Sequence, residues 1–439
     1  MTLRPPTWLQ RVRRALSRSE WAVRLLGLPR TPEGEEGRGL ILIQIDGLAR
    51  EQLEKAISDG RMPFTASLLE GDEYRLLSCY SGIPSTTPAV QGELMYGVKC
   101  AVPSFQFRDH ETGHVVLAGN PMVASRIEER LASEGEGLLK GGSSYGNVYS
   151  GGSEKSSFCA ATLGLGEVLR KANPISLLIV LVLHIFVAVR MAALVAVESL
   201  LAAVDAFRGI IERRDLLREL RFAPKRVALC VLLREMVALG ARVDAARGLR
   251  VVACNFVGYD EQSHHRGPDS LFAHWTLKGI DKAIRGIFRA AERSASRDYD
   301  VWLYSDHGQE PCVAFEDETG HTIHETVSRV FERHGVQREP GTVERPTVQL
   351  QRVILLGGRV LQKLLGWPGE SLFSPVKVGA MGPVAHAYTP EELPDYRKAD
   401  VAQDLVMTED VVAVAGVLRD GSVMLWTDEG SFRLPDEAE

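Results

Sequence analysis

The sequence lacks the features that mark several common classes of protein. Its six cysteines are scattered with no Cys-x-x-Cys pair, which excludes a zinc knuckle and a disulfide scaffold. The net charge is -6, so we expect no bulk binding to nucleic acid, which usually requires a basic surface. We find no internal repeat, and no Gly-Lys-Ser/Thr follows a glycine-rich stretch as a P-loop requires.

Long apolar runs are also missing. The first 30 residues lack the continuous apolar core of a signal peptide, so we expect a location on the cytoplasmic side. The most hydrophobic stretch, 173–204, is interrupted by Arg190, whereas a bilayer-spanning helix needs about 20 apolar residues. A single span there would also place Asp46 and the later candidate residues on opposite sides of a membrane. We therefore expect a membrane-associated helical insertion, with a soluble helical cap as the alternative.

The chain divides by composition into four parts. Arginines near the N-terminus alternate with Trp8 and Trp21, a pattern typical either of a solvated tail or of a helix lying on an anionic membrane surface. The parts that we expect are 1–36, a basic amphipathic segment; 37–172, the first half of an α/β domain; 173–226, a hydrophobic and then charged helical insertion; and 227–439, the second half of the α/β domain.

Three short apolar runs end abruptly near Asp or His residues. They are Leu40–Ile45 before Asp46, Val251–Val257 before Asp260, and Val301–Tyr304 before Asp306 and His307. Runs without a polar face are typical of strands in a mostly parallel sheet that is covered by helices. Open α/β sheets bind ligands at the carboxyl ends of their strands, so these residues should meet at one edge. Because mixed carboxylate and imidazole ligands suit zinc or manganese, we predict a metal site there.

Other elements follow from local patterns. The stretch Ser85-Thr86-Thr87-Pro88 resembles a helix N-terminus, where backbone N–H groups can hold a phosphate. The Gly/Ser-rich stretch 135–152 is predicted to be a flexible connector rather than a substrate-side loop. We further expect helices over 49–69 with a break at Pro63, over 227–239 ending at Gly240, over 270–293 and over 353–365, a strand over 74–78, and a β-hairpin over 420–434.

Taken together, these residues resemble the alkaline phosphatase superfamily, and within it the type I phosphodiesterase/nucleotide pyrophosphatase branch. The matching pieces, in the order of the family, are Ile45-Asp46-Gly47, Pro84-Ser85-Thr86-Thr87, Asp260-x-x-x-His264 with Gly267-Pro268, Ser305-Asp306-His307-Gly308, and a late His. The resemblance implies an α/β fold with a mostly parallel central sheet flanked by helices. It also implies a metal-dependent hydrolase of phosphoric esters, of the phosphodiesterase type.

The resemblance implies two divalent metal ions, usually zinc, with manganese as the alternative. The ligands it implies are Asp260, His264 and His386 for one metal, and Asp46, Asp306, His307 and the nucleophile for the other. We choose His386 as the late His because a Gly-rich approach precedes it. The alternatives to it are His265, His321 and His324.

Thr87 is the nucleophile that the family pattern implies, with Thr86 and then Ser85 as alternatives. An alcohol is a poor nucleophile at neutral pH and needs metal coordination or a base. A phosphothreonine would form and then be hydrolysed. Arg108 and Asn147 are candidate substrate-binding residues, although a salt bridge is the simpler role for Arg108. Asn255 is a further candidate.

The substrate stays open between a small-molecule and a lipid-linked phosphoester. Sulfate esters are not expected, because the signature of the modified sulfatase cysteine is absent. A phosphomonoesterase or a phosphotransferase or mutase of the same superfamily is the alternative within the class. From a different class, the alternative is a catalytically inert, membrane-associated scaffold with this fold. A membrane surface is the partner that the hydrophobic insertion predicts.

Overall fold

The structure is a computed structural model. It describes residues 17–31 except 26, 37–109, 113, 115–162, 228–313, 315–336, 377–389 except 382 and 383, and 392–435, with separate helical positions between 189 and 207. Most of the predicted insertion 173–226, and all of the predicted helix 353–365, lie outside the described residues.

The described residues form two compact units. The first comprises those within Met1–Phe105 and Ala118–Pro311, and the second those within Gln106–Leu117, Cys312–Pro346 and Trp367–Glu439. Each unit has a hydrophobic core of its own. None of the helices in the described part of the chain is long and apolar enough to cross a bilayer.

The first unit is built on a five-stranded sheet with the strand order β5-β4-β6-β1-β7. Its strands are β1 (Gly39–Ile45), β4 (Ser143–Tyr145), β5 (Lys155–Ser157), β6 (Val251–Phe256) and β7 (Tyr299–Tyr304). All the strand pairs of this sheet are parallel. Helices flank the sheet, which confirms the predicted α/β fold with a parallel central sheet.

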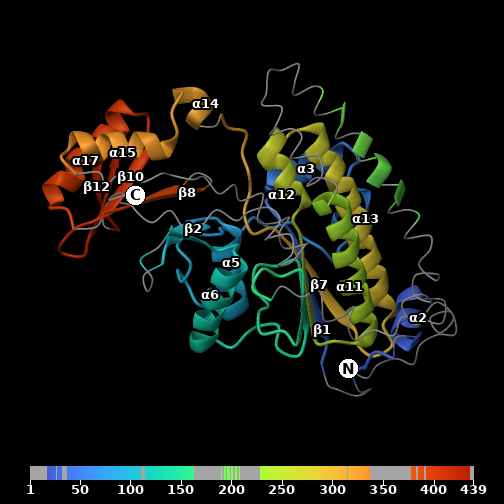
Figure 1. Cartoon of the computed structure of the whole chain (residues 1–439). Coiled ribbons are helices and arrows are strands. Elements are labelled where there is room, and N and C mark those ends of the chain that lie inside the picture. The colour runs from blue at the N-terminus through green and yellow to red at the C-terminus, as the bar shows by residue number, and fades with distance from the viewer. Residues whose placement is uncertain are drawn as a thin grey trace. The chain divides into compact units, whose positions relative to one another are not determined.

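Alternate side chains of β1 point to opposite faces of the sheet, and both faces are buried. Ile41, Ile43 and Ile45 belong to the core that β1 forms with α11 (Arg234–Arg247) and α13 (Leu271–Arg293), two helices that lie side by side in Figure 1. Gln44 points to the other face, where α5 (Thr87–Tyr96) lies. Continuing this alternation, Asp46 also faces α5.

Several predicted elements are confirmed. Two helices separated before Pro63 occupy the stretch 49–69, and α13 begins after the N-cap Ser270, whose side chain accepts a hydrogen bond from the Ala273 N–H. The remaining helices of the first unit are α2 (Arg18–Leu25), α3 (Arg50–Ser58), α4 (Pro63–Leu69), α6 (Pro121–Glu134), the π-helix η1 (Ala228–Leu233) and α12 (Gly258–Arg266). Helix α2 packs against α11 through Ala22 and Val23.

Two predictions for the first unit are wrong. No strand forms over 74–78, whose side chains are all partly or fully exposed, with Leu77 79% exposed. The Gly/Ser-rich stretch 135–152 contains the buried strand β4 instead of a flexible connector. Gly142 permits this pairing, since a Cβ atom there would lie 2.1 Å from the Val251 carbonyl oxygen.

The predicted end of a helix at Gly240 is also wrong. Helix α11 runs through Gly240 to Arg247, and its C-cap Gly248 has the left-handed φ of 83° that often terminates helices. Gly240 serves packing, because a Cβ atom there would lie 2.4 Å from Cε1 of Tyr145 on the neighbouring β4.

The second unit combines small antiparallel sheets with helices. Its elements are β2 (Gln106–Arg108), β3 (Val115–Leu117), α14 (Phe315–Thr319), α15 (Ile323–Arg333), β8 (Lys377–Met381), β9 (Val384–Tyr388), α17 (Asp395–Thr408), β10 (Ala413–Val417), β11 (Val423–Thr427) and β12 (Gly430–Leu434). The antiparallel pair β11–β12 confirms the predicted C-terminal hairpin. Val330, Phe331 and Leu405 join α15 and α17 in one core.

Candidate metal centre

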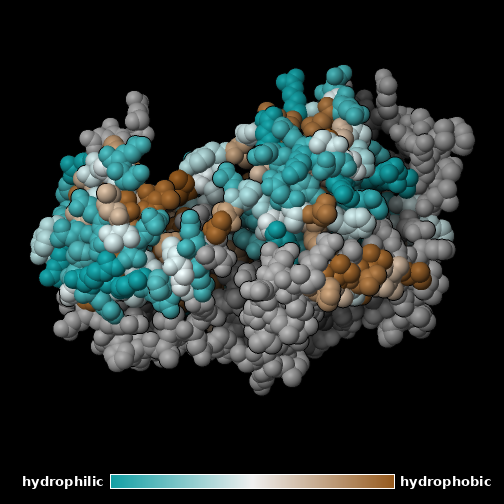
Figure 2. Space-filling view, turned by 90° about the horizontal axis from the view of Figure 1, so that it is seen from above, coloured by the Kyte–Doolittle hydropathy of each residue, from teal (hydrophilic) through white to brown (hydrophobic). Residues whose placement is uncertain are grey.

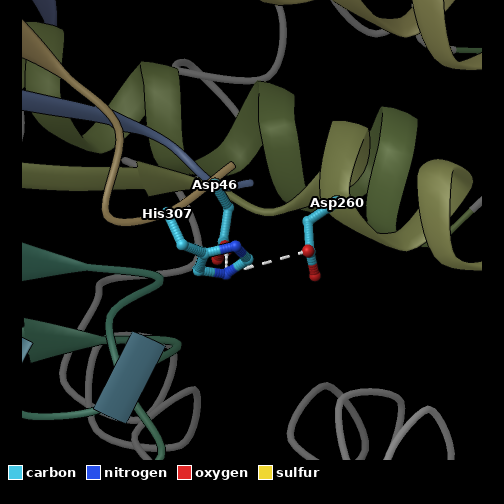
Figure 3. A group of neighbouring side chains, drawn as sticks. All are labelled: Asp46, Asp260 and His307. Atoms are coloured by element: carbon cyan, nitrogen blue, oxygen red, sulfur yellow. Dashed lines mark ion pairs between the residues drawn. The ribbon is translucent and has the colours of Figure 1, made fainter. Parts of the chain in front are cut away.

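Three buried carboxylates and an imidazole gather where β1, β6 and β7 end. Asp46 follows β1, Asp260 lies in the first turn of α12 after β6, and Asp306 and His307 follow β7. None of the three Asp residues is exposed to solvent. Ligand atoms of Asp46, Asp260 and His307 all lie within 4.8 Å of one another, and the dashed lines in Figure 3 mark the ion pairs between His307 and the two carboxylates.

His307 lies within 4 Å of all three carboxylates. Its Nε2 is 3.5 Å from Asp46 Oδ1, 3.9 Å from Asp260 Oδ1 and 3.7 Å from Asp306 Oδ2. His264 lies one turn after Asp260 on α12, so its Nε2 comes within 3.2 Å of Asp260 Oδ1. Unlike His307, His264 is half exposed, so this side of the centre is open to solvent.

Thr87 is the first residue of α5, and its buried hydroxyl belongs to the same cluster. Its Oγ1 donates to Asp46 Oδ1 over 3.2 Å and lies 3.4 Å from His307 Nε2. Thr86 is the N-cap of α5, and its buried Oγ1 has no hydrogen-bond partner among the described residues. The exposed Ser85 donates to the Gly82 carbonyl oxygen over 2.7 Å instead.

The negative charges shift the pKa values of the cluster. Burial, and then the charge of Asp46, raises the pKa of the Asp306 carboxyl to about 7. Burial alone would lower the pKa of His307, but its hydrogen bond to Asp46 and the charges of Asp306 and Asp260 outweigh burial and raise the pKa to about 10. Buried carboxylates this close together repel one another, so the site favours a cation.

Neighbouring amides hold the carboxylates in place. The Gly47 N–H donates to Asp306 Oδ1 over 3.3 Å, Asn255 Nδ2 donates to Asp46 Oδ2 over 2.9 Å, and Gln309 Nε2 donates to Asp260 Oδ1. Gly47 has a φ of 72°, and a Cβ atom there would lie 2.7 Å from Asp260 Oδ1. Sequence reasoning missed Gln309, although its place directly after the Ser-Asp-His-Gly motif is a usable signal.

These residues fit a divalent metal. Asp306 Oδ2 is buried and has no hydrogen-bond partner among the described residues, which leaves a carboxylate oxygen for a cation. Carboxylates combined with imidazole suit zinc or manganese. Asp46, Asp306 and His307 would hold a metal beside Thr87, and Asp260 and His264 would hold a second one. The structure thus brings six of the predicted residues together, while their roles as ligands stay predictions.

His386 is the one predicted ligand that lies outside the first unit. It is on β9 in the second unit, where its ring stacks against Tyr388 with 6.0 Å between the ring centroids. Of the alternatives, His265 is buried on α12, whereas His321 and His324 belong to the second unit. The choice of the late His therefore stays a prediction.

The two predicted substrate-binding residues lie in different surroundings. Arg108 is on β2 of the second unit, where its Nε donates to the Gly113 carbonyl oxygen over 3.1 Å. Asn147 is buried in the first unit and uses both ends of its amide: Oδ1 accepts from Gln91, and Nδ2 donates to Ser144 Oγ. Substrate binding by either residue stays a prediction.

The parallel sheet flanked by helices, with acidic and imidazole side chains at its strand ends, is consistent with an alkaline phosphatase-like fold. Residues 218–410 match the family model of type I phosphodiesterase / nucleotide pyrophosphatase, a family within the alkaline phosphatase superfamily. This match supports phosphoric ester hydrolase activity, in a family that depends on metals.

The match contains Asp260, His264, Asp306, His307 and His386, whereas Asp46 and Thr87 lie before it. The first unit of the structure brings Asp46 and Thr87 to the matched residues. A search of the curated proteins and a search of the solved structures each found no match.

Proposed function

We propose that the chain is a phosphodiesterase that uses Thr87 as its nucleophile and two divalent metals, most often zinc. The observation that carries the proposal is the position of Thr87 Oγ1, 3.2 Å from Asp46 Oδ1 and 3.4 Å from His307 Nε2. A hydroxyl at the N-terminus of a helix and beside a metal-ligand cluster has the surroundings that activate an alcohol.

One residue orients the nucleophile, and the helix N-terminus binds the charged phosphate. Asp46 Oδ1 accepts the hydrogen bond of the Thr87 hydroxyl and so directs the lone pairs of Oγ1 toward the phosphorus. The first N–H groups of α5, those of Thr87 and Ala89, have no acceptor within the helix and can bind non-bridging phosphate oxygens. Metals held by these acidic and imidazole side chains would supply positive charge to the alkoxide and to the phosphate oxygens.

The reaction then has two displacements. Thr87 Oγ1 attacks phosphorus, the bond to the leaving alcohol breaks, and that alcohol takes up a proton in place of the one that the Thr87 hydroxyl loses. The phosphothreonine that forms still carries the second ester group of the substrate. Water then attacks its phosphorus, the bond between phosphorus and Oγ1 breaks, and the free hydroxyl of Thr87 returns with a phosphomonoester as the product. The covalent step separates this mechanism from direct attack by water.

The nucleophile is tested with bis-p-nitrophenyl phosphate and a pair of variants. Thr87→Ala is expected to lower kcat by about 10³-fold or more, because it removes the attacking atom, while Thr86→Ala keeps most of the activity. Acid quenching and mass spectrometry should find the phosphoryl group on Thr87. Metal analysis should find about two zinc or manganese ions per chain, and chelation should abolish activity.

Two results would contradict the proposal. Unchanged diester hydrolysis by Thr87→Ala would remove Thr87 from the mechanism, and an inactive Thr86→Ala together with an active Thr87→Ala would move the nucleophile to Thr86. If metal-free protein hydrolyses the diester at the full rate, the metals have no part in the mechanism.

We also propose that the chain binds an anionic membrane surface, at the cytoplasmic face, and acts there on a lipid-linked phosphoester. Val189, Leu200 and Phe207 are 60%, 67% and 64% exposed, and Figure 2 shows hydrophobic side chains in a band at this segment. Val197 and Val204 lie between them at helical spacing, which is typical of one apolar helix face.

Charge supports the same partner. The stretch 208–226 follows directly and has seven basic and three acidic residues, an excess that suits anionic headgroups. An apolar face followed by arginines is the composition of an interfacial helix, whose apolar side enters the boundary between headgroups and acyl chains. A phosphodiesterase held there would meet phosphoesters of lipid headgroups.

A further inference from the structure

A buried carboxamide lies one helical turn after the proposed nucleophile. Gln91 follows Thr87 by four residues on α5, so both side chains lie on the same face of the helix. Gln91 is not exposed to solvent at all. Its Nε2 donates to Gln44 Oε1 over 2.9 Å and to Asn147 Oδ1 over 3.1 Å, and its Oε1 accepts from the Val148 N–H over 2.7 Å.

These bonds connect α5 to the strands that end in metal-ligand candidates. Gln44 precedes Asp46 by two residues on β1, so the two side chains lie on the same face of the strand. Gln44 Oε1 also accepts a hydrogen bond from the Tyr304 hydroxyl over 3.3 Å. Tyr304 is the last residue of β7, and Asp306 follows it by two residues. Gln91 is therefore hydrogen-bonded to Gln44, and Gln44 in turn to Tyr304; these two residues precede Asp46 and Asp306 by two positions.

Packing alone does not account for an amide at this position. A buried polar group costs free energy unless it is hydrogen-bonded, and an apolar side chain of the same length would fill the space but would make none of the three hydrogen bonds. What the amide adds is directed bonding, because its Nε2 donates both to Gln44 on β1 and to Asn147, and its oxygen accepts from the adjacent Val148 N–H. The hydrogen bonds of Gln91 thus fix the position of α5 along the direction of β1.

We propose that Gln91 is a positioning residue for phosphoryl transfer: it holds α5 against β1 so that the Thr87 hydroxyl stays beside Asp46. This inference rests on the proposed function, since it concerns the placement of Thr87. It predicts a loss in the chemical step rather than in substrate binding or metal binding. Displacing a reacting atom by about 1 Å costs on the order of 10²-fold in rate.

The test is Gln91→Met, which keeps the length of the side chain and removes its donors and acceptor. For bis-p-nitrophenyl phosphate, kcat is expected to fall by about 10- to 100-fold, while KM and the zinc affinity measured by titration change by less than about twofold. Gln91→Glu keeps the acceptor for the Val148 N–H, and Gln44 can turn its Nε2 toward the new carboxylate, so it should recover part of kcat.

Gln52→Met is the matched control. Gln52 is also buried, and its amide links α3 to Asp269 and His274, away from the nucleophile. Both Met variants should lower Tm, because each leaves polar groups without partners, but Gln52→Met should keep the kcat of the parent protein.

Two outcomes overturn the inference, and they are distinguishable. If the parent protein forms phosphothreonine at Thr87 and Gln91→Met lowers only Tm, Gln91 is structural and the proposed function stands. If acid quenching finds no phosphothreonine at Thr87 in the parent protein, the proposed function fails, and the inference about Gln91 fails with it.

Discussion

At the scale of single residues, the fold places like charges together without screening them by solvent. Asp46, Asp260 and Asp306 are all inaccessible to solvent, and the imidazole of His307 lies within 4 Å of each of them. Such an arrangement costs stability in the metal-free protein and contributes affinity when a cation binds. The cluster is therefore better explained by metal binding than by stabilisation of the fold.

Asp306→Asn tests this explanation. In the metal-free protein at pH 8, Tm should rise by on the order of 2 °C, because one repelling charge is removed while the amide oxygen can still accept from the Gly47 N–H. The same variant should bind less zinc and should lose most of the diesterase activity. Calorimetry with and without zinc measures both effects.

Asp300→Asn serves as the control for Asp306→Asn, because Asp300 is half exposed on β7 and pairs with Arg38. It should change Tm little, since exposed ion pairs contribute about 0–1 kcal/mol. A lower Tm of the metal-free Asp306→Asn protein together with unchanged zinc binding would contradict the explanation.

At the scale of elements, the contact between α11 and β4 decides the role of a glycine in the middle of a helix. Helix propensity alone disfavours Gly240, yet α11 continues past it without interruption. The ring of Tyr145 occupies the space where a side chain would be, and the Tyr145 hydroxyl donates to the buried Asp244 on the same helix. Gly240 thus allows α11 and β4 to approach closely.

Gly240→Ala is expected to destabilise the protein by about 1–3 kcal/mol despite the better helix propensity of alanine, because the new methyl group overlaps the Tyr145 ring. Gly286→Ala on α13 is the control, since its Cβ atom would meet only the flexible side chain of Arg242, at 3.4 Å or more. That variant should be neutral or more stable by up to about 1 kcal/mol. Equilibrium unfolding in urea compares them, and equal effects would refute the packing explanation.

At the scale of the whole molecule, the same chain has a candidate metal centre and a band of exposed apolar side chains between residues 189 and 207. The exposed side chains between 189 and 207 would be unfavourable in water unless a partner covers them. Our proposal that an anionic bilayer covers them predicts that binding depends on both lipid charge and these side chains, and that the chemistry does not.

Cosedimentation of the full chain with vesicles tests membrane binding. Binding to phosphatidylcholine vesicles with about 30% phosphatidylglycerol should exceed binding to pure phosphatidylcholine, because of the basic stretch that follows the apolar face. Leu200→Glu combined with Phe207→Glu should weaken binding by about tenfold or more and leave hydrolysis of a soluble diester unchanged. Met407→Glu, an exposed apolar position on α17 of the second unit, is the control. Equal binding by all variants would refute the proposal.

The sequence by itself determined the central strands and the residues at their ends. Continuous apolar runs, followed by Asp46, by Asp260 or by Asp306 and His307, are local patterns, and the parallel sheet then brings their ends together. The N-cap at Ser270 and the C-terminal hairpin are local for the same reason. This is why most of the candidate ligands were predictable before any contact was known.

Only the tertiary structure decided the features that depend on contacts between distant segments. Gly142, directly before β4, lets the chain approach the Val251 carbonyl oxygen, and Gly240 lets α11 approach the ring of Tyr145. Gln91 and Gln309 acquire their partners in the same way. A glycine or an amide carries little local preference that reveals its partner, because its role is set by whichever backbone or polar atom the fold places next to it.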